Sequence, residues 1–217
     1  MDGTRAKPVV GYRKKLTFTI CSVKIKVKLV RKAESAVKTI YLIRHCQAEG
    51  QEREARLTKA GESQARELAA FLKNKQIDRI VSSPFERAVS TIRPFAEEAG
   101  MDIETDERLT ERVLSGAPKP NWLEMLEKSF SDPGLAFEGG ESAAEAGKRG
   151  IDAINKVLEK SGKNAVVVTH GNLMATILRH YDNSYGFELW KSLSNPDVFE
   201  LTFKGNSPKI KRIWEWN

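Results

Sequence analysis

The stretch Thr39-Ile40-Tyr41-Leu42-Ile43-Arg44-His45 places a guanidinium and an imidazole directly after an apolar run. A short apolar run that is bounded by polar residues predicts a buried β-strand. Arginine and histidine side chains at the end of such a strand are suited to binding phosphate. This stretch therefore predicts the first strand of a sheet and one side of a phosphate site.

Two later segments repeat this arrangement. Residues 79–87 contain an apolar run followed by Ser-Ser-Pro and an arginine, and residues 165–171 contain Ala-Val-Val-Val followed by Thr-His-Gly. In open α/β sheets, ligands bind outside the carboxyl ends of the strands. We therefore predict that four side chains, far apart in the sequence, converge on one crevice: Arg44, His45, Arg87 and His170.

Helical patterns separate these strands. Thr58 is the predicted N-cap of a helix that runs to about Lys75 and has one apolar face. The spacing Ser83-Pro84-Phe85-Glu86 predicts a capping box with proline at the first helical position, and Gly100 predicts a left-handed end for that helix. The residues expected on the apolar face of the first helix are Ala65, Leu68, Ala69 and Leu72.

The C-terminal third completes the predicted fold. A long helix is expected over residues 141–161, and closing strands over residues 198–203 and 210–216. The side chains of the long helix that should point inward are Ile151, Ile154, Val157 and Leu158. The whole pattern predicts an α/β fold with three layers, α/β/α, and a mostly parallel central sheet.

Residues 112–140 interrupt the alternation of strands and helices. This segment is rich in glycine, proline and large apolar residues, with a short helix predicted at about residues 120–130. We interpret it as a small inserted cap over the mouth of the site. Its apolar residues are expected to serve ordinary packing more than a substrate pocket.

Four motifs in order resemble the histidine phosphatase superfamily, in its phosphoglycerate-mutase-like group. They are Arg44-His45, Ser-Ser-Pro-x-x-Arg-Ala-x-x-Thr at residues 82–91, Leu-x-Glu at 109–111 and Thr-His-Gly-Asn at 169–172. The resemblance extends over about Lys38 to Phe203. It implies phosphoryl chemistry that needs no metal or other cofactor.

The resemblance also implies roles for individual residues. His45 would be the nucleophile that becomes phosphorylated, and Glu111 would be the proton donor. The residues that would bind the phosphate or the substrate are Arg44, Gln51, Arg87, His170 and Gly171. His170, Arg44 and Arg87 would thereby belong to the catalytic set as well.

Elementary chemistry supports these roles. A histidine with an ordinary pKa near 6.5 is largely neutral at pH 7 and can attack phosphorus, and a covalent intermediate divides one difficult displacement into two easier ones. The equatorial oxygens of a transferring phosphoryl group call for preorganised cations, and arginine offers a planar donor fork. One carboxyl group can protonate the leaving alkoxide and later deprotonate the attacking water.

Two positions depart from the pattern of the family. Cys46 occupies the place of the usual glycine after the nucleophile, and Gln51 occupies that of an asparagine. The pair His45-Cys46 also permits a cysteine-phosphatase interpretation, in which an arginine follows the cysteine by six positions. That position is Glu52, which would repel a phosphate, so we regard this alternative as the weaker one.

Composition and charge place the chain among soluble globular proteins. It has 217 residues, 40% of them hydrophobic and 30% charged, and a net charge of +7. The excess of positive charge lies in residues 1–36, which hold ten basic and two acidic residues, whereas the remainder holds 26 basic and 27 acidic ones. A near-neutral body predicts neither a nucleic-acid nor a membrane partner.

We therefore divide the chain into a basic leader, residues 1–36, and a phosphatase domain, residues 37–217, with its cap at about 112–140. We favour the interpretation that the leader precedes a natural start at Val37. A surface-binding arm and an added strand, suggested by the alternation over residues 23–29, are the alternatives. Two cysteines and no apolar run of membrane-spanning length predict a cytoplasmic location.

Three functions remain open from sequence, in the order phosphatase, phosphoglycerate mutase and non-catalytic module that binds phosphorylated ligands. A mutase must retain a doubly phosphorylated intermediate and needs additional cations in its cap. Between Arg112 and Glu138 the cap has only Lys119 and Lys128. A phosphatase that acts on a small phosphate monoester is therefore the favoured prediction.

Overall fold

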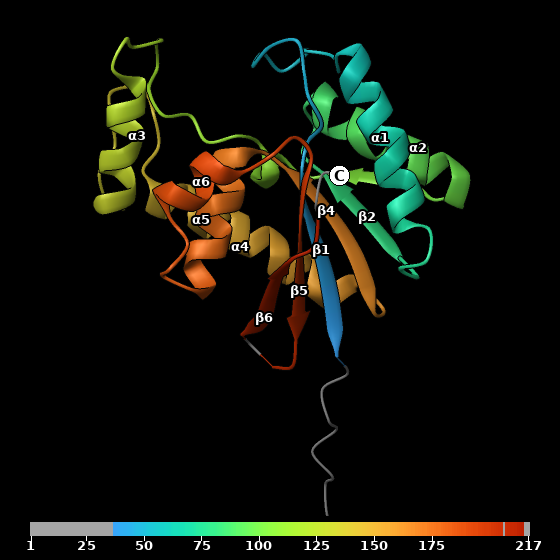
Figure 1. Cartoon of the computed structure of the whole chain (residues 1–217). Helices are drawn as coiled ribbons and strands as arrows, with labels where there is room; N and C mark the ends of the chain where they lie inside the picture. Colours follow the sequence, from blue (N-terminus) through green and yellow to red (C-terminus); the bar gives the residue numbers. More distant parts are fainter. Residues whose placement is uncertain (1–36, 206, 215–217) are drawn as a thin grey trace, which may run out of the picture. The chain divides into compact units, whose positions relative to one another are not determined.

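The computed structural model describes residues 37–205 and 207–214 (Figure 1). The predictions for the basic leader lie outside this range and stay predictions. None of the helices in the described ranges is long and apolar enough to cross a lipid bilayer.

One six-stranded sheet organises the described domain, and its strand order is β3-β2-β4-β1-β5-β6. Four neighbouring strands are parallel, and the last two are antiparallel to their neighbours, so the predicted mostly parallel sheet is confirmed. The strands are β1 (Lys38–Arg44), β2 (Arg79–Ser82), β3 (Ile103–Thr105), β4 (Asn164–Thr169), β5 (Asp197–Phe203) and β6 (Pro208–Arg212).

The register of the sheet brings the three predicted strand ends to one edge. Arg44, the last residue of β1, is opposite Thr169 of β4, and Ser82 of β2 is opposite Val168. Two further bonds continue this alignment, because the His45 N–H donates to the Thr169 carbonyl at 3.0 Å and the Ser83 N–H donates to the Val168 carbonyl at 2.9 Å. The residues that follow β1, β2 and β4 therefore lie next to one another.

Helices cover both faces of this sheet, which confirms the predicted three layers (Figure 1). Ile40 and Leu42 of β1 pack in the core shared with α4 and α5, whereas Tyr41 and Ile43 pack in the core shared with α1 and α2. This alternation follows from the two-residue period of a strand. The covering helices are α1 (Lys59–Leu72), α2 (Glu86–Ala99), α4 (Ala143–Lys160) and α5 (Gly171–Tyr181).

Several predicted helix features are confirmed. The Thr58 hydroxyl accepts the Gly61 N–H at 3.0 Å at the start of α1, although this helix ends three residues before the predicted Lys75. Gly100 ends α2 in the left-handed conformation, with φ of 63°. All four residues expected on the apolar face of α1 are buried: Ala65, Leu68, Ala69 and Leu72.

The capping box predicted at residues 83–86 is wrong. Helix α2 begins at Glu86 after Phe85, without a side-chain cap, and Pro84 lies before the helix. The Ser83 hydroxyl instead accepts the Phe85 N–H at 3.3 Å and contacts His170. A capping box does occur at α4, where Ser142 and Glu145 bond reciprocally.

The cap segment forms a single helix, α3 (Trp122–Ser131), close to the predicted bounds. It packs on α6 (Phe187–Ser192), a helix that the sequence pattern did not predict, through the ring pairs Trp122–Trp190 and Phe130–Phe187. Strand β3 and a short 3-10 helix, η1 (Glu107–Leu109), were also not predicted, and β6 ends at Arg212, before the predicted Trp216. Short elements carry too little periodic signal to be detected from sequence.

Candidate active site

The structure brings together the four side chains predicted to converge. His45 follows β1, Arg87 lies in the first turn of α2 and His170 precedes α5. The Arg87 Nε is 3.3 Å from the His45 Nε2, and the rings of His45 and His170 are 5.1 Å apart between centroids. Arg44 joins this group beside Gly171, where a Cβ would stand 3.1 Å from the Arg44 guanidinium carbon. Glycine at position 171 therefore leaves room for that guanidinium.

The hydrogen bonds of His45 define its tautomer. Its Nδ1 lies 2.7 Å from the Cys46 carbonyl oxygen, which can only accept, so Nδ1 carries the hydrogen and Nε2 carries the lone pair. The Asn195 side-chain amide donates to the His45 carbonyl at 2.7 Å and holds the backbone at this point. The Nε2 of His45 therefore has a lone pair, and this nitrogen faces Arg87.

The environment of His45 keeps its ring neutral. Burial is the main cause that lowers the pKa of His45, to about 3, and the positive charges of Arg87 and Arg44 lower it further. A neutral imidazole is the form that can act as a nucleophile. Burial, with a smaller contribution from these two cations, thus keeps the His45 ring neutral.

The depressed pKa of His45 predicts a specific dependence of stability on pH. The unfolded chain, with a histidine pKa near 6.5, binds more protons than the folded chain between about pH 3 and 6.5, so stability is lost as the pH falls through this window. From pH 7 to pH 5 the free energy of unfolding should fall by about 2 kcal/mol more in the parent than in His45→Asn. Urea unfolding at both pH values measures the difference, and equal losses in the two proteins would contradict the pKa.

Arg87 is completely buried and is held on two sides. Its Nη1 donates to the backbone carbonyls of Gln51 and Glu52, at 3.1 and 2.8 Å, and its guanidinium lies 4.9 Å from the Phe85 ring centre. Gln51 thus contacts the site through its backbone, while its side chain is exposed. The predicted role of the Gln51 amide in binding substrate stays a prediction.

Arg44 is anchored by the segment after α6. Its Nη1 donates to the Leu193 carbonyl at 2.9 Å and approaches the Ser194 carbonyl at 3.4 Å. Its Nε is buried and has no hydrogen-bond partner within the described residues. The bonds from Nη1 therefore fix the orientation of this guanidinium. Its Nε remains able to donate a hydrogen bond to an anion.

His170 is fixed by Ser83. The His170 Nε2 lies 2.8 Å from the Ser83 hydroxyl oxygen, and its buried Nδ1 has no hydrogen-bond partner in the part of the chain that the structure describes. Burial, followed by the nearby His45 and Arg87, lowers the pKa of His170 well below its usual value. A neutral ring that is held at Nε2 has Nδ1 left for a ligand.

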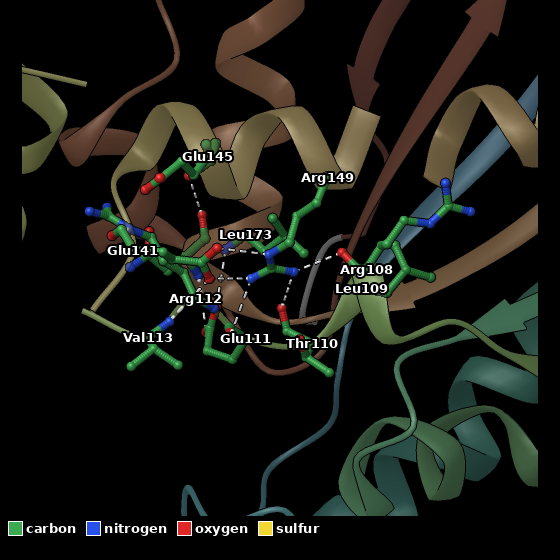
Figure 2. Close-up of polar contacts among 12 residues, drawn as sticks. Arg108, Leu109, Thr110, Glu111, Arg112, Val113, Glu141, Glu145, Arg149 and Leu173 are labelled. Carbon is green, nitrogen blue, oxygen red and sulfur yellow. Dashed lines mark hydrogen bonds and ion pairs between the residues drawn. The ribbon is translucent and has the colours of Figure 1, made fainter. Parts of the chain in front are cut away.

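Glu111 lies against the N-terminus of α5, the helix that begins directly after His170. Its carboxylate accepts the N–H groups of Asn172 and Leu173, at 3.2 and 3.1 Å, and that of Arg112 at 2.9 Å (Figure 2). The start of a helix offers free N–H groups that bind anions. These bonds place Glu111 beside the histidine and arginine cluster.

Cys46 points away from this cluster into an apolar environment. Its thiol is fully buried with Leu57 and Ala65, and burial raises its pKa to about 12. Its backbone N–H donates to the Thr91 hydroxyl at 2.8 Å. A reactive cysteine needs an accessible thiolate, so the cysteine-phosphatase alternative has no support in this geometry.

Comparison with known proteins agrees with the geometry of the site. A profile of the histidine phosphatase superfamily (branch 1) matches residues 40–215. The chain belongs to the histidine phosphatase superfamily. The match covers most of the chain, and the predicted domain boundary at residue 37 stays a prediction.

Relatives of this chain carry names of both reaction types, phosphatase and mutase. It is 28% identical to the "Putative phosphoserine phosphatase 2" of Hydrogenobacter thermophilus, over 80% of this chain and 94% of that one. It is also 28% identical to the "Probable phosphoglycerate mutase GpmB" of Yersinia pestis (strain Pestoides F), over 64% and 72%. Its fold resembles the solved phosphoglycerate mutase from Bacillus anthracis, with a TM-score of 0.67, 18% identity and coverage of 84% and 95%.

Several residues that shape the site of this superfamily member were not predicted from sequence. Ser83 and Thr91 belong to a motif that was recognised, but their contacts with His170 and Cys46 were not foreseen. Arg87 and Thr91 are four residues apart, so both lie on one face of a helix. This spacing could have indicated that Thr91 faces the site. Asn195 and the Leu193 carbonyl reach the site from a distant loop, and no local pattern marks them.

Proposed function

We propose that this protein is a phosphate monoester hydrolase that works through a phosphohistidine on His45. The observation that carries the proposal is the position of the His45 Nε2, a lone pair on a buried neutral ring that faces the Arg87 guanidinium. A phosphoryl group on this nitrogen would lie against Arg87. Arg44 and His170 would contact its other oxygens.

The first step forms a bond between the His45 Nε2 and phosphorus and breaks the bond from phosphorus to the ester oxygen. The guanidinium groups of Arg44 and Arg87 compensate the negative charge on the phosphoryl oxygens. The departing alkoxide takes a proton from the Glu111 carboxyl, which becomes a carboxylate. The products of this step are a free alcohol and a phosphohistidine.

The second step returns the enzyme to its starting state. A water molecule attacks phosphorus and gives a proton to the Glu111 carboxylate, while the bond from phosphorus to Nε2 breaks. Inorganic phosphate leaves, and Glu111 again carries the proton needed for the next substrate. One carboxyl group thereby serves both steps, and the resemblance to the family implies that no metal or other cofactor takes part.

The charges of the cap favour hydrolysis over mutase activity. Lys128 forms an ion pair with Glu124, at 2.6 Å, and Arg112 is buried with its Nη1 bonded to Ser129. The Lys128 charge is thus compensated by Glu124, whereas the buried Arg112 keeps one guanidinium nitrogen, Nη2, without a hydrogen-bond partner among the described residues. Lys119 is the only other cation between Arg112 and Glu138.

A pair of assays tests this proposal. The purified protein should release phosphate from p-nitrophenyl phosphate and from alkyl phosphates, and should interconvert phosphoglycerates at less than about 1% of that rate. A screen of phosphorylated metabolites, with His45→Ala as the control, would then identify the substrate class. Interconversion that is faster than phosphate release would favour a mutase, and unchanged ligand binding without turnover in both proteins would favour a binding module.

A further inference from the structure

We infer that the ion pair between Arg149 and Glu141 positions Glu111 for proton transfer, an inference that rests on the proposed function. Both residues lie outside the group that would contact phosphate. Arg149 is in the middle of α4, and Glu141 immediately precedes the N-cap of that helix. Figure 2 shows the guanidinium of Arg149 pointing into the segment that carries Glu111.

Arg149 holds the backbone of that segment through several bonds at once. Its Nη1 donates to the carbonyls of Arg108 and Thr110, at 2.7 and 2.9 Å, and its Nη2 approaches the Glu111 carbonyl at 3.4 Å (Figure 2). Beyond η1 this segment has no helix or strand until α3 begins at Trp122. The bonds from Arg149 therefore replace those that regular secondary structure would supply.

Glu141 binds Arg149 and also contacts the residues that follow Glu111. Its carboxylate accepts both the Nε and the Nη2 of Arg149, at 2.9 and 2.5 Å, and approaches the Val113 N–H at 3.4 Å. The Glu141 carbonyl also accepts the Arg112 Nε at 3.1 Å. The pair thus fixes the chain both before and after Glu111, and its two-pronged geometry resists rotation of either partner.

Two helices, α4 and α5, hold the backbone and the side chain of Glu111. Its backbone is held by Arg149 of α4, and its carboxylate is held by the first N–H groups of α5. Helices α4 and α5 pack directly against each other, with Gly150 allowing close contact with Ile177. Burial is the main cause that lowers the pKa of His170, and the Arg149 charge adds a smaller contribution in the same direction.

Proton transfer depends steeply on such positioning, because a displacement of about 1 Å costs about 10²-fold in rate. The loss should depend on the leaving group. Release of p-nitrophenolate needs little protonation, whereas release of an alkoxide needs a proton from Glu111. A variant with a misplaced Glu111 should therefore lose much more kcat/KM toward an alkyl phosphate than toward p-nitrophenyl phosphate.

The experiment compares kcat/KM for β-glycerol phosphate and for p-nitrophenyl phosphate in the full chain. Arg149→Met should lose about 10²-fold toward the alkyl ester and less than about fivefold toward the aryl ester. Arg149→Lys should recover part of the alkyl activity, since it keeps the charge but not the fork. Glu111→Gln supplies the reference pattern for a lost proton donor.

Arg108→Met is the matched control. Arg108 makes a similar two-pronged pair with Asp106, at 2.9 and 2.7 Å, on the same segment, and Figure 2 shows its side chain directed away from Glu111. This variant should lower both activities equally or not at all. Thermal unfolding of each variant checks that the fold is retained.

The outcomes separate the inference from the proposed function. Equal losses toward both esters in Arg149→Met, or no loss, would overturn the positioning role of Arg149. The proposed function would still stand if the parent protein forms phosphohistidine. A parent without turnover would overturn both. A selective loss toward the alkyl ester that matches Glu111→Gln supports the positioning role.

Discussion

Replacing His45 by asparagine is expected to lower the rate of phosphate release by about 10⁴-fold or more, the scale seen when a covalent nucleophile is removed. The asparagine amide can still donate to the Cys46 carbonyl, as the His45 Nδ1 does at 2.7 Å, so the backbone of the site should remain in place. The lone pair of Nε2 has no replacement. Initial rates with p-nitrophenyl phosphate measure the effect.

The same variant should also lose the covalent adduct. Parent protein quenched during turnover of a ³²P-labelled substrate should carry label that is released by acid and retained in base, and His45→Asn should carry none. His180→Asn is the matched control, because His180 is exposed on the last turn of α5. Label on Cys46, or label that persists in His45→Asn, would refute the mechanism.

Replacing Arg87 by methionine is expected to cost about 10³-fold in kcat/KM, the lower end of what a phosphate-binding arginine contributes to phosphoryl transfer. The guanidinium adjoins the attacking nitrogen at 3.3 Å and also holds the Gln51 and Glu52 carbonyls. Arg87→Lys should cost about 10²-fold, because the ammonium keeps the charge but cannot span the same partners. Steady-state kinetics of both variants test this order.

Arg87 also supports the fold, so its kinetic effect needs a structural control. Loss of its bonds leaves two carbonyls without their partner, which should lower the free energy of unfolding by about 1–3 kcal/mol. Arg93→Met, on the exposed side of the same helix, removes an ion pair with Glu86 and a hydrogen bond to Ser90, and should preserve activity. A rate in Arg87→Met within tenfold of the parent would exclude a direct role in phosphate binding.

Much of the fold was predictable because the strands have strong local signals. The runs that became β1 and β4 are continuous and apolar, as expected for strands covered on both faces. The convergence of His45, Arg87 and His170 followed from one topological rule about parallel sheets, so three distant positions could be placed together without coordinates.

The supporting contacts of the site were not predictable in the same way. Arg44 depends on the Leu193 carbonyl, and Glu111 depends on Arg149, across 149 and 38 positions of sequence. Such pairs arise from tertiary packing and leave no periodic pattern. The capping box expected at Ser83 failed for a related reason, because the hydroxyl of Ser83 contacts His170 as well as the turn before α2.

The hydrogen bonds from the first N–H groups of α5 to Glu111 make those backbone amides sensitive to the protonation of its carboxylate. When the carboxylate takes up a proton, it becomes a weaker acceptor for the Asn172 and Leu173 amides. The chemical shifts of those two amide hydrogens should therefore change when the acid–base group changes its charge. Nuclear magnetic resonance could follow each half of the catalytic cycle at these sites without a label on the substrate.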